Sequence, residues 1–553
     1  MTHPSPISVL PTHEVTNQPP PLGDVDLYAT DTALREAVAR HWAAAAGPQI
    51  QKLGRVMGRA DTMELANAAN RHKPELITFD RYGRRVDEVE FHPAYHTLMG
   101  IAVEHGIPSV AWTRQGQGGH VTHVALEYIF GQVEGGVCCP MTMTHAAVPV
   151  LRRHDALWAA WGDKILHGVY DPKLAPIAQK AGVTIGMAMT EKQGGSDVRS
   201  NATTATPTAI LGGGWHTLAG HKWFCSAPMS DAFLTLAQTE KGLTCFFVPR
   251  ILDDGTRNPF FIQRLKDKLG NWSNASSEIE YNGTLGVMVG EPGRGIATIL
   301  EMVHQTRLDT AMAPVGLMRQ ALIQAIHHSR HRTAFQRKLI DQPLMRGVLA
   351  DLALEWEAAM LLLFRVAESY DDSHKSDDSA AFARLGVAIA KYHLNKLAPQ
   401  FVYECMEALG GIGYVEESVL ARLYREAPLN SIWEGSGNVI CLDALRTAIK
   451  EPASLEALAA ELAKAKGIDG HFDKEADEIM AMWRAPVPEH TARRLVERTA
   501  VLLQAALMIQ FLPSAIAGLF CASRIAGDHG RAYGTLPDIS VAQTLLDRVW
   551  PDR

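Results

Sequence analysis

The hydrophobic pattern changes twice along the chain, and this constrains the fold more than any other feature. Up to about residue 181 the pattern is mostly helical, as in the Ala- and Leu-rich stretches 33–46 and 145–166. From 182 to about 290 Thr, Gly, Val and Phe become frequent and turn sequences appear, which favours strands. Helical spacing then returns and continues to the end. We therefore expect an α+β fold that is mostly α.

These changes divide the sequence into five segments, of which the first is a Pro-rich, polar stretch that predicts an extended arm. The last segment begins after Glu451-Pro452. The expected boundaries are 1–30 for the N-terminal arm, 31–181 for an N-terminal helical domain, 182–290 for a β domain, 291–450 for a helical bundle and 451–553 for an extra C-terminal helical domain.

Two hairpins are predicted inside the β domain. Residues 232–238 and 243–248 have strand-like composition and flank the turn Glu240-Lys241-Gly242. The dipeptide Asn282-Gly283 follows a strand-like stretch at 277–281, which is a strong hairpin signal.

Two features of the later helical region carry predictions of their own. Leu344, Val348, Leu352 and Trp356 recur every four residues and predict one face of a long helix. The acidic, Ser-rich stretch 370–380 predicts an exposed loop.

Composition indicates a folded protein of the cytoplasm. Hydrophobic residues make up 47% of the chain, and the net charge of −7 does not attract nucleic acid or an anionic membrane. The seven cysteines are odd in number and include no CxxC pair, which predicts free thiols. No secretory signal is recognisable. The uncharged stretch 500–523 is interrupted at Pro513, which favours two buried helices over a membrane span.

Three segments carry residues suited to chemistry. The first, 187–200, combines hydroxyls with Gly194 and Gly195, which allow a ligand to approach the backbone; a capped polar turn is the alternative. The second, 407–426, holds a Gly-rich turn between helices that can pass close to an adenine or ribose. It is not a dinucleotide-binding fingerprint, because no strand leads into it.

The third segment surrounds Glu434, which lies in Ile432-Trp-Glu-Gly-Ser-Gly-Asn438. A carboxylate beside Trp433 and glycines is a good candidate for a general base, since apolar neighbours raise its proton affinity. A Glu that caps the next helix is the alternative.

Together the three segments resemble the sequence signatures of the acyl-CoA dehydrogenases, in the order and separation typical of that family. The resemblance covers residues from about 30 to 450. Its AidB-like branch, the adaptive-response flavoproteins, is matched more closely. The matching stretches are Asn17-Gln-Pro-Pro, Phe91-His-Pro-Ala, Cys139-Pro-Met-Thr-Met-Thr, Thr190-Glu-Lys-Gln-Gly-Gly-Ser-Asp-Val, Arg264-Leu-Lys-Asp-Lys-Leu-Gly-Asn and Asn430-Ser-Ile-Trp-Glu-Gly-Ser-Gly-Asn.

The resemblance implies FAD as cofactor and α,β-dehydrogenation of an acyl-CoA thioester. Glu434 matches the base that removes the α proton while hydride leaves the β carbon. Some members place the base just before the Arg that here is Arg307, but that position is Thr306, which cannot act as a base. Arg307 is expected in the substrate site. The AidB-like branch is thought to be a poor dehydrogenase, so turnover is expected to be slow.

The resemblance also implies a set of flavin contacts, some of them across a subunit interface. Arg332 and Phe335 match positions that reach a neighbouring subunit's flavin, so a homotetramer is expected, with an electron-transfer flavoprotein as acceptor. Phe224 stands where many members have Trp, and Trp223 precedes it, so which ring stacks on the flavin is left open. The remaining positions are Met189, Thr190, Ser196, Cys225, Ser226, Gly410, Gly411, Gly413, Ile432, Trp433, Gly435, Ser436, Gly437, Asn438 and Leu442.

Two other ligands are weighed against the charges and spacing of the chain. His327 and His331 are one helical turn apart but lack a third ligand, so no metal is expected. The AidB resemblance suggests DNA binding by the C-terminal domain. Residues 451–553 contain eleven Lys and Arg against fourteen Asp and Glu, a net charge of −3 that disfavours DNA, although an Arg493-Arg494-Arg498 helix face remains a candidate.

The alternative functions are therefore an AidB-like DNA-binding or alkylation-protection flavoprotein with little turnover, and an oxidase of the same fold. Nitroalkane oxidases keep Asp at the base position, where this chain has Glu434.

Overall fold

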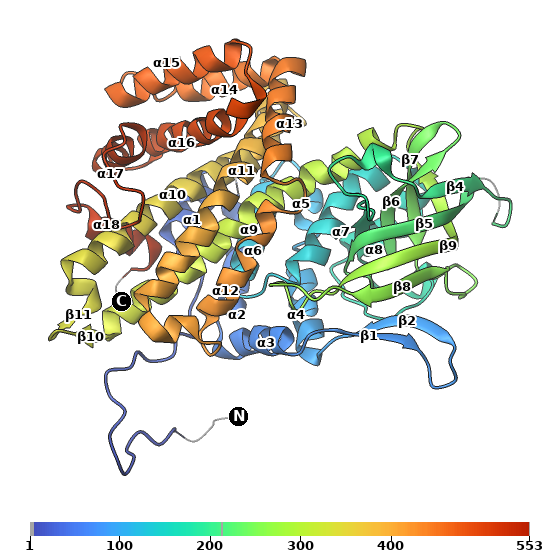
Figure 1. Ribbon diagram of the computed structural model, residues 1–553, viewed down its shortest axis with the longest axis horizontal. Helices are drawn as coiled ribbons and strands as arrows, with labels where there is room; N and C mark the ends of the chain where they lie inside the picture. Colours follow the sequence, from blue (N-terminus) through green and yellow to red (C-terminus); the bar gives the residue numbers. More distant parts are fainter. Residues whose placement is uncertain (1–4, 42, 212–213, 552–553) are drawn as a thin grey trace.

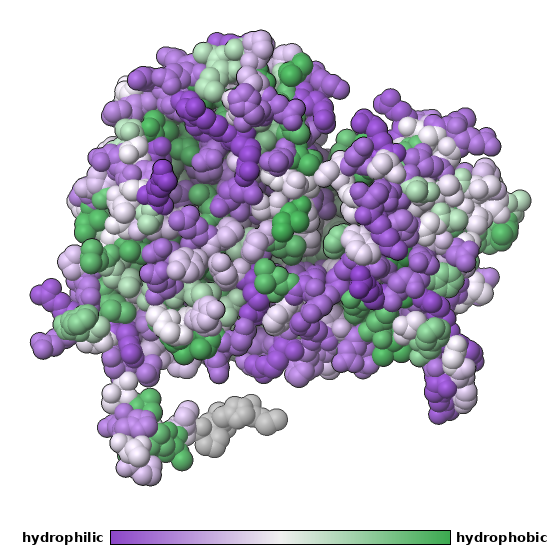
Figure 2. All heavy atoms as spheres, in the orientation of Figure 1, coloured by the Kyte–Doolittle hydropathy of each residue, from purple (hydrophilic) through white to green (hydrophobic). Residues whose placement is uncertain are grey.

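A computed structural model describes residues 5–41, 43–211 and 214–551. Parts of four predictions lie outside the described residues: 1–4 of the arm, 42 in the first helical stretch, 212–213 of the β domain and 552–553 of the last segment. Figure 1 shows a helical body beside a β domain, with the arm extending away from the body. Figure 2 shows hydrophobic side chains on the arm. Ile7 and Val9, which belong to the arm, are both exposed.

The N-terminal helical domain contains a hairpin that was not predicted. Residues 75–90 form two short antiparallel strands, closed by a turn in which Asp80 accepts hydrogen bonds from two backbone N–H groups. The helical stretch 145–166 is in fact two helices, because His154 caps the second by accepting from the Leu157 N–H. The elements are α1 (Thr32–Arg40), α2 (Gly47–Met57), α3 (Ala60–Arg71), β1 (Glu75–Phe79), β2 (Arg85–Glu90), α4 (Pro93–Glu104), α5 (Val110–Thr113), α6 (Gly119–Gly131), α7 (Cys138–Leu151) and α8 (Asp155–Leu166).

The β domain is a seven-stranded sheet that closes on itself, because β6 pairs with β7 as well as with β3 and β4. The predicted β6–β7 hairpin is confirmed. The hairpin predicted at Asn282-Gly283 is wrong. Both residues lie inside β9, and Gly283, at φ 80°, is the extra residue of a β-bulge opposite Leu218 and Ala219. The strands are β3 (Ile185–Ala188), β4 (Thr204–Pro207), β5 (Trp215–Ser226), β6 (Ala232–Thr239), β7 (Gly242–Pro249), β8 (Phe260–Leu265) and β9 (Ser276–Val289).

Long helices form the bundle that follows. Leu352 and Trp356 are fully buried as predicted, but Leu344 at the start of the same stripe is 86% exposed. The loop predicted at 370–380 is shorter than expected, since only residues 373–376 separate the two helices and Tyr370 is buried against His304. The elements are α9 (Gly295–His331), β10 (Thr333–Ala334), β11 (Arg337–Lys338), α10 (Pro343–Asp372), α11 (Asp377–Ala408), α12 (Val419–Glu426) and α13 (Gly437–Lys450).

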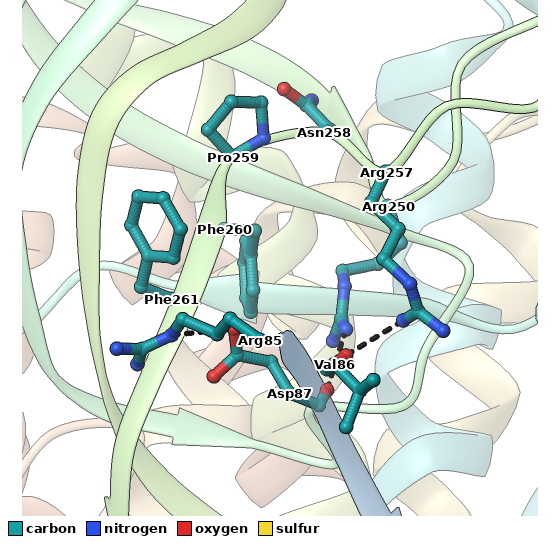
Figure 3. Close-up of a pocket in the computed structure, with 9 residues that line it drawn as sticks. All are labelled: Arg85, Val86, Asp87, Arg250, Arg257, Asn258, Pro259, Phe260 and Phe261. Atoms are coloured by element: carbon teal, nitrogen blue, oxygen red, sulfur yellow. Dashed lines mark hydrogen bonds and ion pairs between the residues drawn. The ribbon is translucent and has the colours of Figure 1, made fainter. Parts of the chain in front are cut away.

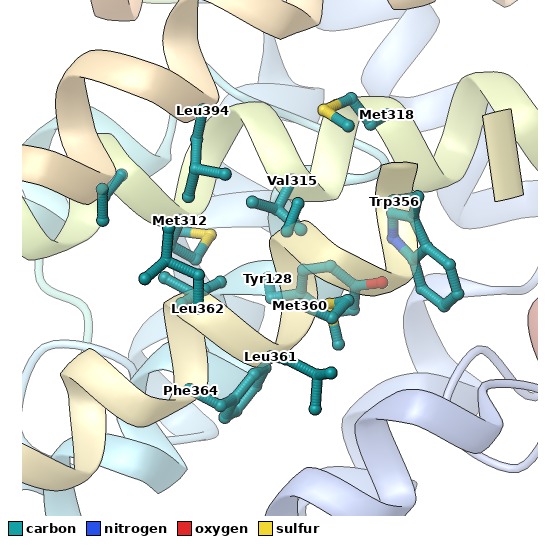
Figure 4. Packing of buried hydrophobic residues seen from close by; sticks show 14 of the residues in the cluster. Tyr128, Met312, Val315, Met318, Trp356, Met360, Leu361, Leu362, Phe364 and Leu394 are labelled. Atoms are coloured by element: carbon teal, nitrogen blue, oxygen red, sulfur yellow. The ribbon is translucent and has the colours of Figure 1, made fainter. Parts of the chain in front are cut away.

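The C-terminal segment packs directly onto this bundle and shares its core. One continuous hydrophobic cluster includes Trp356 and Met360, whose packing Figure 4 shows, together with Leu503 of the C-terminal segment. The stretch 500–523 forms two helices that separate near Pro513, and within the described ranges no helix has the length and apolarity needed to cross a membrane. The helices are α14 (Ala453–Ala463), α15 (Gly470–Arg484), α16 (Ala492–Phe511), α17 (Ser514–Phe520) and α18 (Ala542–Val549).

Candidate active site

Glu434 occupies a strained turn between a short 3-10 helix (Leu429–Ser431) and α13. Its φ is 56° and that of Gly435 is 100°, so two consecutive residues have left-handed backbone conformations. For a residue with a Cβ this conformation costs of order 1 kcal/mol and persists only where surrounding contacts hold it. The turn directs the half-buried carboxylate of Glu434 toward α9.

On α9 the carboxylate meets the Thr306 hydroxyl, which donates a hydrogen bond to Oε2 at 2.6 Å. Burial raises the pKa of Glu434 above its usual value. The Thr306 hydrogen bond and the positive charges of Lys391 and Arg307 act in the opposite direction. Thr306 was excluded as a base from the sequence, and in the structure its hydroxyl is instead a hydrogen-bond donor to Glu434.

Lys391 of α11 lies beneath the turn, and sequence reasoning missed it. Its Nζ donates to the carbonyl oxygens of Asn430, Trp433 and Gly435 at 3.1, 3.0 and 2.9 Å. The side chain is buried, and burial lowers its pKa to about 7 while the Glu434 carboxylate opposes that shift. Lys391 is about 40 residues from this turn in the sequence, and no sequence motif around it indicates the contact.

Arg307 was expected to bind substrate, but its guanidinium already has a partner. Nη1 donates to Asp443 Oδ2 at 2.7 Å, and Arg384 donates to both oxygens of the same carboxylate. Arg307 is only 8% exposed. Burial alone would raise the pKa of Asp443, but these two arginines lower it. The structure thus places Arg307 in an ion-paired group beside the base, where it contributes positive charge.

The ends of β3 and β5 supply the opposite side of the site. Met189 just after β3 and Trp433 in the Glu434 turn both pack against one hydrophobic cluster. Ser226 is half-buried and its hydroxyl shares a hydrogen bond with that of Ser276 at 3.0 Å. Cys225 is fully buried in the interior of the β domain, so its thiol is turned away from this surface. Its backbone pairs with that of Ser277 in β9, and its carbonyl oxygen accepts a hydrogen bond from the Ser277 hydroxyl at 2.9 Å.

Cys139, at the start of α7, joins this group. Burial, together with the Glu434 carboxylate, raises the pKa of its thiol to about 12. The thiol is therefore neutral near physiological pH and acts as a small apolar wall of the site.

The glycines expected at the cofactor divide into two kinds. A Cβ on Gly195 would lie 2.4 Å from the Thr190 hydroxyl, and one on Gly413 would lie 2.3 Å from the Met406 carbonyl oxygen, so packing within the chain requires both. A Cβ on Gly410 or Gly411 would meet no atom within 4 Å. Gly410 and Gly411 thus border open space, as does Gly194 in the first segment.

The remaining expected contacts vary in exposure. Phe224 is 49% exposed and Ile432 is 66% exposed, both large apolar groups next to the site. Thr190, Gly437 and Leu442 are half-buried, as is Gly435 within the turn, and Ser196, Ser436 and Asn438 are exposed.

Arg332 and Phe335 are not brought to this site. They lie beside the β10–β11 hairpin, which Figure 1 places at the end of the helical body away from the β domain. Arg332 Nη1 donates to the Asn17 backbone oxygen of the arm at 2.7 Å. Phe335 is 93% exposed with φ 50°.

These residues fit the cofactor that the resemblance implies. Phe224 and Ile432 expose apolar surface that a flat ring system would cover, and the Thr190 and Ser226 hydroxyls offer polar partners for its edge. The open space at Gly410 and Gly411 suits the adenosine end. The donor set and the glycine space are thus compatible with a dinucleotide.

Two cavities lie elsewhere. Figure 3 shows one of about 140 Å³ between β2 and β8, where Arg250 donates to the Asp87 backbone oxygen. The other, about 510 Å³, is lined by residues including Tyr95, Tyr170 and Asp231. Neither is lined by Glu434 or by another expected site residue.

A buried polar cluster of α6, α7 and α9 was also missed. Ligand atoms of His123, His145 and Asp309 lie within 4.8 Å of one another, which makes the group a candidate metal site. The His123 and His145 rings are stacked at 3.9 Å and 14°, so their in-plane lone pairs run nearly parallel and do not converge on one point. Burial lowers the pKa of His123, but the carboxylates of Asp309 and Glu127 raise it to about 9. A protonated His123 thus balances the acids.

Comparison with known proteins identifies the family. Residues 17–172 match the adaptive response protein AidB N-terminal domain, 186–284 the acyl-CoA dehydrogenase middle domain and 293–449 the acyl-CoA dehydrogenase C-terminal domain. The putative acyl-CoA dehydrogenase AidB of Escherichia coli is 44% identical over 512 residues, covering 92% of this chain and 94% of that protein. Acyl-CoA dehydrogenase family member 11 of Caenorhabditis elegans is 32% identical over 402 residues, covering 70% of this chain and 64% of that protein.

Solved structures agree with these matches. Caenorhabditis elegans ACDH-11 in complex with C11-CoA superposes with a TM-score of 0.83 at 26% identity, covering 94% of this chain and 95% of that one. Bd2924 in its apo form superposes with a TM-score of 0.81 at 29% identity, covering 89% of this chain and 98% of that one. Members of this family bind FAD. The expected mostly α, α+β architecture is confirmed. The chain belongs to the acyl-CoA dehydrogenase family, in the branch that carries the AidB N-terminal domain.

Proposed function

We propose that this protein is an FAD-dependent enzyme that dehydrogenates an acyl-CoA thioester between its α and β carbons, with Glu434 as the base. The observation that carries the proposal is the position of Glu434. Its half-buried carboxylate has a raised pKa and faces Thr306, next to the cluster that Met189 and Trp433 share. The C11-CoA complex of the Caenorhabditis elegans protein supports a thioester ligand.

In this reaction the Glu434 carboxylate takes the α proton, and its raised pKa makes it a stronger base than an exposed carboxylate. The Thr306 hydroxyl holds the accepting oxygen in place. The Glu434 backbone N–H donates to the thioester carbonyl and stabilises the enolate charge as it develops. FAD, when bound, supplies the hydride acceptor for the β carbon.

The cofactor would be held by Met189, Thr190 and Ser226 at the flavin end, and by Gly410 and Gly411 at the adenosine end. Phe224 would cover the ring, because it projects from the same strand end as Ser226.

A second subunit would complete the site through Arg332 and Phe335. Since Phe335 is 93% exposed on a strained turn far from Glu434, it is suited to a neighbouring subunit, which supports a tetramer. An electron-transfer flavoprotein is the proposed acceptor, and the seven free thiols support a cytoplasmic location. We expect slow turnover, because the resemblance to the AidB-like branch implies a poor dehydrogenase.

Anaerobic mixing of the FAD-loaded protein with a panel of acyl-CoA thioesters tests the proposal. Flavin bleaching by at least one thioester is expected, and Glu434→Gln should slow it by roughly a thousandfold, as expected for loss of a general base. Glu456→Gln on α14, an exposed Glu in the C-terminal segment, is the matched control and should bleach at the parent rate. No bleaching by any thioester would overturn the proposal.

A further inference from the structure

The turn that carries Glu434 directs three of its backbone carbonyls to one point. The oxygens of Asn430, Trp433 and Gly435 all lie 2.9–3.1 Å from Lys391 Nζ, and they flank position 434 on both sides. Three carbonyl dipoles that converge in a buried place repel each other unless a cation neutralises them. The ammonium group is therefore part of the structure of the turn.

The ammonium has three N–H donors, and each carbonyl can take one of them. A buried ammonium loses its hydration, so it persists only where hydrogen bonds replace the lost water. The backbone of Lys391 is fixed as well. Asn395 donates to the Lys391 carbonyl oxygen at 2.8 Å and to the Thr310 carbonyl oxygen of α9 at 2.9 Å, which ties α11 to the helix that carries Thr306.

The two helices thus hold different parts of the base. Thr306 of α9 fixes the carboxylate, while Lys391 of α11 fixes the backbone on either side of it. The left-handed φ of Glu434 is strained and needs such support. We propose that Lys391 is a positioning residue that holds the Glu434 turn in the conformation from which the carboxylate can reach substrate. This rests on the proposed function.

The decisive variant is Lys391→Met, which keeps the length of the side chain but removes all three donors. We expect the limiting rate of anaerobic flavin bleaching by an active acyl-CoA to fall about 100-fold, while the Kd for that acyl-CoA changes less than threefold. Lys391→Arg restores a cation with several donors, so its limiting bleaching rate should be at least tenfold higher than that of Lys391→Met. Lys450→Met, which removes an exposed charge from the far end of α13, should stay within twofold of the parent.

Hydrogen exchange gives a readout that does not depend on turnover. In the FAD-loaded protein, amides of residues 428–442 should exchange at least tenfold faster in Lys391→Met than in the parent or in Lys450→Met. Residues 349–364 of α10 report on the fold and should be unchanged. If Lys391→Met does not accumulate, Lys391→Gln, with two donors, should show an intermediate effect in both measurements.

Parent-like bleaching and parent-like exchange in the Lys391 variants would overturn the positioning role. Equal losses in rate and in acyl-CoA affinity would also contradict it, since they would indicate general damage to the site. If the parent itself is bleached by no thioester, the proposed dehydrogenation fails, and the exchange measurement still decides whether Lys391 holds the turn.

Discussion

Burial raises the pKa of Glu434, and the Thr306 hydroxyl lowers it by donating to the ionised carboxylate. The opposition matters because a base must be ionised to accept a proton yet basic enough to hold it. Lys391 adds positive charge on the far side of the turn. Burial thus raises the basicity of Glu434, and groups from two helices, α9 and α11, oppose that effect.

Thr306→Val tests this balance. The hydrogen bond favours the charged carboxylate, so its loss should raise the pKa of Glu434 further and move the rising limb of the pH–rate profile to higher pH. Hydrogen bonds to charged groups contribute about 1.5–3 kcal/mol, so bleaching near neutral pH should slow by about tenfold or more. Thr306→Ser keeps the hydroxyl and should retain the parent profile. Superimposable profiles for the parent and Thr306→Val would show that the contact does not tune the base.

At the scale of elements, the Gly-rich turn between α11 and α12 has two structural roles: it packs against a helix end and it borders open space. Gly410–Tyr414 forms a 3-10 turn, in which Gly413 packs against the last turn of α11 while Gly410 and Gly411 border open space. One motif therefore closes a helix and leaves room for a ligand, and the sequence signature does not distinguish the two roles.

A matched pair of alanine variants separates these roles. Gly413→Ala forces a Cβ against the Met406 carbonyl oxygen and should destabilise the protein by roughly 1–3 kcal/mol, as overpacking does. Gly411→Ala meets open space and should leave the melting temperature within a degree or two of the parent while weakening FAD retention. Thermal unfolding and flavin release during gel filtration measure the two effects. The two roles would be contradicted if Gly413→Ala unfolds at the parent temperature, or if Gly411→Ala retains FAD as well as the parent does.

At the scale of the whole molecule, the C-terminal segment is part of the helical body. Its helices share one hydrophobic cluster with α9, α10 and α11, and Arg548 forms ion pairs with Glu36 near the N-terminus and with Glu357 of α10. The segment therefore closes the body around the bundle, and its removal would expose the core of α10.

The same segment is expected to bind DNA weakly. The whole chain carries a net charge of −7, and of the three arginines on the candidate face Arg498 pairs with Glu475 and Glu478, while Arg493 donates to Tyr392. Few cationic side chains on this face are therefore available to contact phosphates and displace the counterions of DNA. Fluorescence anisotropy should show little binding of duplex DNA even at low salt. Tight binding with a steep salt dependence that Arg493→Ala/Arg494→Ala abolishes would contradict this expectation.

The sequence by itself determined the succession of helices, strands and helices, because hydrophobic periodicity and turn residues act locally. It also identified Glu434, since the residues around it form a contiguous signature. Local signals failed where tertiary contacts competed with them. Asn282-Gly283 became a bulge because β9 continues along β5, and the expected loop near Tyr370 became helix because Tyr370 packs on His304.

Only the tertiary structure decided what surrounds the base. Thr306 lies 128 residues from Glu434 along the chain, and the three carbonyls that Lys391 binds lie 39 to 44 residues away from it. Contacts of this kind depend on how helices pack, and packing is fixed by the whole core rather than by any single stretch of sequence. The proposed base is therefore visible in the sequence, whereas the residues proposed to hold and tune it appear only when the chain has folded.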